Sequence, residues 1–194
     1  MRKKRALSSP CATQVKQEIK RVEHKSHFNR IMRSTIGVIV VAAALSVLVA
    51  TLWLPILQTR GDSMTPTLYA NEILVSTKIS EFKSGDIVAF YYNNKILIKR
   101  IIAGPTDWVD ITEDGSVYVN GQLLDEPYVQ EKSLGECNIT FPYQVSDGRY
   151  FVMGDHRSTS TDSRHSSIGC ISEEHIVGKL VFRLWPLSRF GKIG

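Results

Sequence analysis

The longest apolar segment of the chain runs from Ser34 to Leu57 and contains no charged residue. It lacks a polar stripe, which distinguishes it from a helix packed on one side of a soluble protein. At about 1.5 Å of rise per residue, a helix of this length spans a hydrocarbon core of roughly 30 Å. The apolar region of a secretory signal peptide is shorter, with about 7 to 15 residues. The pattern therefore predicts a single transmembrane helix over residues 34–57.

After Leu57 the apolar residues occur in short stretches that are separated by turn formers. The stretches are rich in β-branched and aromatic residues, which is typical of strands; they read NEILVSTKI, GDIVAFYY, KILIKRII, SVYVNGQLL, YFVMGD and GKLVFRLWP. Asp114-Gly115 and Asn120-Gly121 are dipeptides that favour hairpin turns. Helical periodicity is weak, apart from a possible turn at residues 172–175. The pattern predicts a mainly β domain over residues 58–194.

The region from about residue 107 to residue 147 differs from its surroundings because it is acidic and rich in turns. It contains Glu126-Pro127 and a polar stretch from Gln130 to Glu136. We interpret it as a small β lobe inserted between two halves of a core, which comprise residues 58–106 and 148–194.

Positive charge is concentrated before the apolar run. Residues 1–33 contain 10 of the 24 Lys and Arg residues and 2 of the 19 acidic residues, which leaves 14 basic and 17 acidic residues for the rest. Because positive charge beside a membrane helix stays on the cytoplasmic side, we expect a basic cytoplasmic tail over residues 1–33 and an extracytoplasmic β domain. The tail then lies near anionic lipid of the cell membrane. A net acidic outer domain argues against binding to nucleic acid.

The cysteines and histidines do not form a recognisable metal motif. His165, Cys170 and His175 stand in an H-x4-C-x4-H array without an evident fourth ligand, so structural zinc is not expected. Cys137 and Cys170 fall on the side of the membrane where disulfides form, and the sequence leaves their pairing open.

The segment TRGDSMTPTL, residues 59–68, follows the apolar run directly. Gly61, Asp62 and Ser63 are common turn residues, so this segment alone favours a plain turn after the membrane helix. A serine at this place becomes a candidate nucleophile only if a base lies beside it.

The predicted strand KILIKRII carries Lys99 and Arg100 in its apolar middle. If both faces of the strand are covered, burial lowers the pKa of the lysine and makes its neutral amine available as a general base. The arginine stays protonated, so it requires solvent or an acid. A serine beside such an amine forms a Ser-Lys dyad, the nucleophilic arrangement of one class of proteases. The competing interpretation is that Lys99 extends its side chain to solvent.

A third polar segment, GDHRSTSTDSR, spans residues 154–164 and follows the predicted strand YFVMGD. Its two Asp and two Arg residues lie among five hydroxyl residues. Acid–arginine pairs at the end of a buried strand can hold the geometry of a site. The alternative is an ordinary solvated loop.

Four motifs in this order behind one membrane helix resemble the bacterial type I signal peptidases, and among them the Gram-positive enzymes. They are GDSMTPTL, SGDIVAF, ILIKRIIAGPTD and MGDHRSTSTDSR, and the resemblance covers nearly all of the chain from Arg60 onward. It implies a signal-peptidase-type β-fold and a membrane-bound serine endopeptidase. Such an enzyme removes signal peptides from secreted precursors after small residues (A-x-A-like) by Ser-Lys acyl transfer, without a metal or cofactor.

The resemblance also implies roles for single residues. Ser63 is the nucleophile, Lys99 is the general base, and Ser160 is the hydroxyl that orients the lysine amine. The oxyanion hole uses the backbone N–H of Ser63, and Gly61 stands where some members have a second, hydroxyl donor. The remaining matches are the supporting residues Asp155, Arg157, Asp162 and Arg164, and the pocket-lining residues Met64, Leu68 and Ile98.

The chain departs from the family pattern near these motifs. His156 stands where the family usually has Asn, Ala103 and Thr106 stand where it usually has Gly, and Gly104 replaces a larger apolar residue. A Ser-His dyad with His156 is disfavoured because Lys99 is present. Two alternatives stay open: a processing protease dedicated to one pilin or conjugation precursor, and a catalytically silent anchored β-module that binds peptides or envelope partners.

Overall fold

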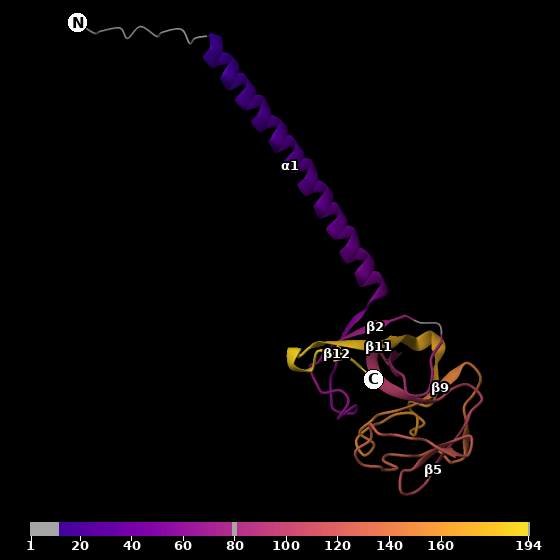
Figure 1. Cartoon of the computed structure of the whole chain (residues 1–194). Helices are drawn as coiled ribbons and strands as arrows, with labels where there is room; N and C mark the ends of the chain where they lie inside the picture. The colour runs from indigo at the N-terminus through magenta and orange to yellow at the C-terminus, as the bar shows by residue number, and fades with distance from the viewer. Residues whose placement is uncertain (1–11, 79–80, 194) are drawn as a thin grey trace. The chain divides into compact units, whose positions relative to one another are not determined.

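The computed structural model describes residues 12–78 and 81–193 (Figure 1). The chain divides at residue 50 into two compact units, a helical one and a β one, which we describe separately. Helix α1 (Ala12–Trp53) contains the segment Ile31–Leu48, which has a mean hydropathy of 2.1. By its length and composition, this segment can cross a membrane.

Helix α1 ends at Trp53 and not at Leu57, where the apolar run predicted its end. Pro55 lacks a backbone N–H and disfavours a helical conformation of the residue before it, which explains the earlier end. Residues Ile56–Gln58 form strand β1 and pair with strand β2 (Ile73–Thr77). The last apolar residues of the run therefore belong to the β unit.

An eight-stranded sheet forms the body of the β unit, and all of its strand pairs are antiparallel. Its order is β1-β2-β11-β3-β4-β9-β10, with β12 paired to β11. The further strands are β3 (Ile87–Tyr92), β4 (Lys95–Ala103), β9 (Arg149–Met153), β10 (Ile171–Ser172), β11 (Ile176–Trp185) and β12 (Gly191–Lys192). Two short 3-10 helices, η1 (Glu173–His175) and η2 (Leu187–Arg189), flank β11. The predicted mainly β fold is confirmed.

A second sheet has four strands in the order β7-β6-β5-β8. Its strands are β5 (Trp108–Ile111), β6 (Val117–Val119), β7 (Gln122–Leu123) and β8 (Tyr143–Gln144). Asn120 and Gly121 both have positive φ, as the hairpin between β6 and β7 requires. The small inserted β lobe is thus present, while its exact limits, residues 107–147, stay a prediction.

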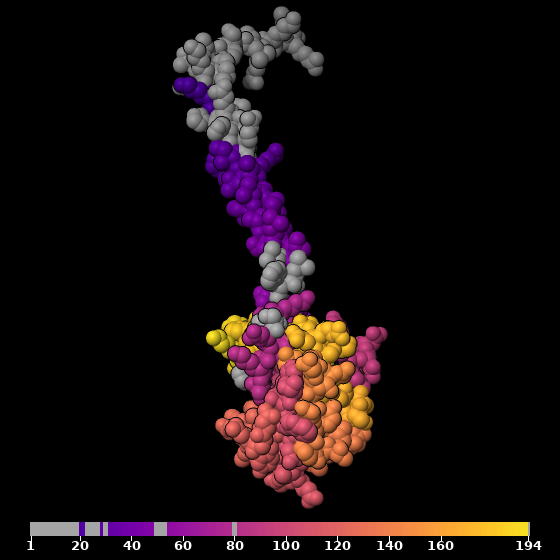
Figure 2. Space-filling model, turned by 90° about the vertical axis from the view of Figure 1, so that its right-hand side faces the viewer, coloured from indigo at the N-terminus to yellow at the C-terminus, as the bar shows by residue number. Residues whose placement is uncertain are grey.

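One hydrophobic cluster joins the two sheets. Ile102 and Phe151 of the large sheet pack against Val109 and Val117 of the small one, and all four are fully buried. On the face shown in Figure 2, the small-sheet segment (salmon) adjoins the orange segment that carries β9. The lobe therefore shares its core with the strand that precedes the polar loop of residues 154–164.

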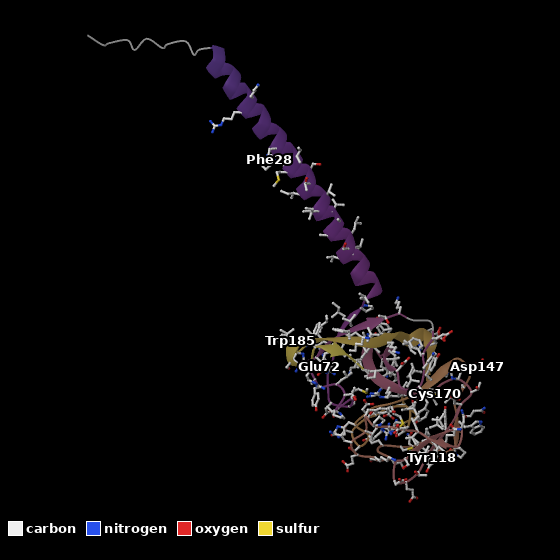
Figure 3. All side chains as sticks on the ribbon, in the orientation of Figure 1. Phe28, Glu72, Tyr118, Asp147, Cys170 and Trp185 are labelled. Atoms are coloured by element: carbon white, nitrogen blue, oxygen red, sulfur yellow. The ribbon has the colours of Figure 1, made fainter. Side chains whose placement is uncertain are left out.

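Glu72, which is labelled in Figure 3, is a buried carboxylate. It connects the C-terminal part of the chain to the segment that follows Ser63. Its Oε1 lies 2.7 Å from Arg189 Nη1, and its Oε2 lies 2.8 Å from Arg183 Nε. The second contact is not aligned for a hydrogen bond, so it is an electrostatic contact. Both arginines also donate to the carbonyl of Thr67. Strand β11 and helix η2 thereby support the loop behind the candidate nucleophile.

We expect Glu72→Ala to lower the free energy of unfolding of the β unit by about 2–3 kcal/mol, because it leaves two cations without their carboxylate. The cost stays below that of a fully buried pair because the Arg189 side chain is 35% exposed. Chemical denaturation measures the change. Lys179→Ala, which removes the more exposed pair with Asp86, is the control and should cost less than about 1 kcal/mol. Equal costs for both variants would contradict the assigned role of Glu72.

Candidate active site

Ser63 lies on a tight turn between β1 and β2. The backbone N–H of Thr65 donates to the carbonyl of Asp62 at 2.9 Å, which closes the turn around the serine. The next residue, Met64, and the more distant Leu68 are buried in a core cluster with Ile87. Because its neighbour is anchored in the core, the turn holds the half-buried Ser63 hydroxyl at the surface of a cleft.

Lys99 lies on β4, and its Nζ is 2.7 Å from Ser63 Oγ. The lysine is 4% exposed, so the interpretation that it extends to solvent is wrong. Burial lowers the pKa of Lys99 below its ordinary value. Asp162 and Asp155 raise this pKa, while Arg164 lowers it further, and the effect of burial is the largest. The site therefore favours a neutral amine beside a serine hydroxyl.

Arg100, the next residue on β4, is also buried, and it reaches an acid as predicted. Its Nε and Nη2 donate to the two carboxylate oxygens of Asp155 at 2.9 and 2.7 Å. The guanidinium also lies over the ring of Tyr128, 3.8 Å from its centroid. Asp155 accepts a further hydrogen bond from Thr67 Oγ1 on the segment that follows the serine. This network connects the strand of the lysine to the loop of the serine.

Asp162 is the centre of the loop formed by residues 154–164, and it is fully buried. Its carboxylate accepts hydrogen bonds from the Gly154 N–H at 2.9 Å and from Ser160 Oγ at 2.8 Å. It also pairs with Arg164, whose Nε and Nη2 each lie 2.8 Å from one of its oxygens. The alternative of a solvated loop is therefore wrong for this part of the segment.

The two arginines of this loop connect it to the inserted lobe. Arg164 donates to the carbonyl of Leu134, and Arg157 pairs with the buried carboxylate of Glu126. Gly135 has a positive φ, and a Cβ on it would overlap the Arg157 carbonyl and the Arg164 side chain. The lobe thus packs directly on the loop that surrounds the site.

Ser160 lies next to the nucleophile turn, but its hydroxyl donates to Asp162 and not to the lysine. Among the described residues, Ser63 is the one hydrogen-bond partner of Lys99 Nζ. A Cβ on Gly154 would overlap both Ser160 Oγ and the Ser63 carbonyl, so this glycine permits the close approach of the two segments. The orientation of the lysine amine by Ser160 stays a proposal.

We expect Gly154→Ala to lower the activity at least about tenfold, because the added methyl forces the Ser63 carbonyl away and lengthens the distance to Lys99. The measurement is kcat for cleavage of a precursor, the activity that the sequence resemblance leads us to expect, together with the unfolding midpoint. Gly104→Ala is the control for an added methyl, because a Cβ placed on Gly104 meets only Asp107 Oδ2, at an ordinary contact distance of 3.6 Å. An active Gly154→Ala protein would show that the close approach is not needed.

A cleft with a volume of about 610 Å³ runs past Ser63 and Lys99. Its walls come from residues 56–61, which include β1, and from residues 94–98, which include the first half of β4. The predicted pocket residues Met64, Leu68 and Ile98 all line it. The β1 wall was missed from the sequence, since it was interpreted as the end of the membrane helix. Pro55 is the signal that indicates otherwise.

Both cleft walls have an open strand edge. β1 is the terminal strand of its sheet, so one of its edges has no partner strand among the described residues. Residues 95–98 of β4 pair with β3, whereas β9 pairs with β4 only from Arg100 onward. Open strand edges present unpaired N–H and C=O groups, which accept an extended peptide as an added strand.

The proposed oxyanion hole also lies on the cleft. Among the described residues the backbone N–H of Ser63 has no acceptor, so it is available to a ligand. Gly61 lines the same cleft with a φ of +80°, and no atom lies within 4 Å of a Cβ placed on it. The two positions predicted for this function are therefore close together and open.

The structure describes the surroundings of the cysteines and the grouping of the side chains that bind metals in proteins. Cys137 and Cys170 are both free cysteines, and Cys170 is buried in the cluster that joins the two sheets. Within residues 12–78 and 81–193, no group of three or more His, Cys, Asp or Glu residues is placed to hold a metal ion.

A family model and curated relatives identify the family of the chain. The family model described as signal peptidase, peptidase S26, matches residues 32–185. Signal peptidase IB of Staphylococcus aureus (strain COL) is 38% identical over 152 residues, which are 68% of this chain and 78% of that protein. Signal peptidase I S of Bacillus subtilis (strain 168) is 36% identical over 166 residues, 79% of this chain and 89% of that protein. A crystal structure of a signal peptidase I from Enterococcus faecalis matches with 30% identity and a TM-score of 0.44, covering 53% of this chain and 99% of that one.

Proposed function

Because the chain belongs to the signal peptidase family, peptidase S26, we propose that it removes N-terminal signal peptides from preproteins with Ser63 as nucleophile and Lys99 as general base. The family membership makes it a protease of the signal peptidase I type. The observation that carries the assignment of residues is the 2.7 Å distance between the buried Lys99 Nζ and Ser63 Oγ.

The proposed reaction is an acyl transfer in two steps. Neutral Lys99 takes the proton of Ser63 Oγ, and this oxygen attacks the scissile carbonyl. The resulting oxyanion accepts a hydrogen bond from the backbone N–H of Ser63. The lysine then gives its proton to the leaving amine, and a covalent ester remains on Ser63. In the second step Lys99 takes a proton from water, the hydroxide attacks the ester, and Ser63 recovers its proton as the signal peptide leaves. Every proton is supplied and returned by the dyad.

The cleft supports an extended substrate with small side chains next to the scissile bond. A peptide that adds to the open edges of β1 and β4 is held by main-chain hydrogen bonds, which do not select a sequence. Met64, Leu68 and Ile98 supply apolar walls, and Met64 and Leu68 are themselves buried. We propose that these walls take the small residues that follow the apolar segment of a signal peptide, the A-x-A pattern.

We further propose that α1 anchors the enzyme in the cell membrane, with the basic tail in the cytoplasm and the β unit outside. The apolar segment Ile31–Leu48 and the ten basic residues of residues 1–33 support this orientation. Nine residues, 54–62, separate the helix from the nucleophile, an extended reach of at most about 32 Å. The nucleophile stays close to the membrane surface, where the end of a membrane-embedded signal peptide emerges.

Cleavage of several unrelated precursors with A-x-A sites by the full-length, detergent-solubilised chain tests the proposal. We expect cleavage directly after the last small residue, as determined by sequencing the new N-terminus. Cleavage of one precursor alone would favour a dedicated processing protease. A chain that cleaves none and does not react with a serine-directed boronate or penem would be a silent peptide-binding module, and the proposal would be wrong.

A further inference from the structure

His156 connects the turn of the nucleophile to the loop that carries Ser160. Its backbone N–H donates to the Ser63 carbonyl at 3.1 Å, and its own carbonyl accepts the Ser160 N–H at 3.1 Å. Both bonds involve main-chain groups, so most residues at this position can make them. The side chain adds a third contact, because ring Nδ1 lies 3.1 Å from Thr65 Oγ1. This third contact depends on the identity of the residue.

The direction of the third contact follows from the single proton of the Thr65 hydroxyl. Thr65 Oγ1 lies 2.8 Å from the carbonyl of Asp62, which has no proton to give, so the hydroxyl donates there. Having donated its only proton, Oγ1 can only accept at the imidazole. Nδ1 must therefore carry a hydrogen. Among the described residues His156 Nε2 makes no hydrogen bond, so no protein contact favours the opposite tautomer.

We propose that His156 is a positioning residue, which donates from Nδ1 to Thr65 and thereby holds the turn that presents Ser63 to Lys99. The inference rests on the proposed Ser-Lys mechanism. Thr65 closes this turn through its backbone N–H and its hydroxyl, both on the carbonyl of Asp62. His156 stabilises the closing residue and takes no part in the proton transfer, because Ser63 Oγ is already paired with Lys99.

The family usually has asparagine at the position of His156, and the side-chain amide of asparagine can make the same contact. An Asn side chain places its NH2 donor near the position of imidazole Nδ1, whereas a Gln side chain places it near Nε2. Histidine and asparagine thus offer the same donor to Thr65, and glutamine does not. This difference gives a matched pair of substitutions at one position.

The test compares His156→Asn, His156→Gln and His156→Ala in the full-length, detergent-solubilised chain. His156→Asn should retain the native kcat, while the Gln and Ala variants should lose about three- to tenfold, the effect of one neutral hydrogen bond. KM should change little, because His156 does not line the cleft. In a Thr65→Val background, His156→Ala should cause no further loss, since the two residues act through one contact.

Equal activity of the Asn, Gln and Ala variants, or additive losses with Thr65→Val, would overturn the proposal. Nitrogen-15 NMR of the unsubstituted chain, at a pH where the ring is neutral, reports the tautomer without any variant. A hydrogen on Nδ1 is the expected result, and a hydrogen on Nε2 would overturn the proposal even if the variants misfold. The same spectrum of the Ser63→Ala protein tests the role of His156 separately from the proposed Ser-Lys mechanism, because the tautomer does not depend on whether Ser63 is the nucleophile.

Discussion

Ser63→Ala should reduce precursor cleavage by roughly 10⁴- to 10⁶-fold, the range seen when the nucleophile of a serine protease is removed. Only the oxyanion hole and substrate binding then remain to act on the scissile bond. The cleft walls and the buried neighbours Met64 and Leu68 are unchanged, so the variant should still bind precursor. The measurement is the initial rate of cleavage at saturating substrate, with binding followed separately.

Ser146→Ala is the matched control, because this serine is exposed and its hydroxyl has no partner among the described residues. It should cleave at the native rate. A Ser63→Ala protein with substantial cleavage, free of contaminating protease, would place the nucleophile elsewhere and remove the basis of the dyad. A serine-directed boronate that labels the native chain and not the variant would support Ser63 independently.

The strands and the dyad were predictable from the sequence because both depend on local patterns. Apolar stretches rich in β-branched residues, separated by turn formers, became β2, β3, β4, β9 and β11. Two cations inside the apolar stretch of β4 indicated burial, and burial of a lysine requires a special environment. The serine was a candidate only because that lysine exists.

Apolar character alone did not locate the end of the membrane helix, although Pro55 is a local signal for it. Ile56 and Leu57 are as suitable for a strand as for a lipid-exposed helix, so apolar character does not separate the two. The pairing of β1 with β2 decides between them, and this pairing depends on contacts with residues 73–75. For this reason the sequence did not reveal that β1 forms one wall of the cleft.

The local sequence pattern also did not predict which residues form ion pairs and hydrogen bonds across long distances in the chain. Glu126 of the inserted lobe pairs with Arg157. Thr67, in the loop behind the serine, donates to Asp155. Composition shows that the arginines need acids, but many acids are available in the chain. The choice is made by the packing of the lobe and the sheet, since a buried charge is stable only beside its partner.

Substitution of Lys99 should affect activity and stability in opposite directions. Lys99→Met removes the base and should lower cleavage by roughly 10⁴-fold or more. Lys99→Arg should lower the rate of cleavage almost as much, because a guanidinium keeps its proton at any accessible pH. The buried site disfavours the charged amine, so Lys99→Met should raise the free energy of unfolding at neutral pH. Lys83→Met, at an exposed lysine without an ion pair among the described residues, is the control for both measurements.

The pH dependence follows from the lowered pKa of Lys99, whose cause is burial. Only the neutral amine accepts a proton from Ser63, so kcat should rise as pH increases through the pKa of the folded state, with a midpoint below the ordinary lysine value. Between that pKa and the ordinary value, the unfolded chain binds the proton and the folded chain does not, so stability also rises with pH. The stability advantage of Lys99→Met should therefore shrink as pH increases through the same window. A native enzyme with an acidic optimum, or a Lys99→Met advantage that does not change with pH, would show that the buried amine is not the base.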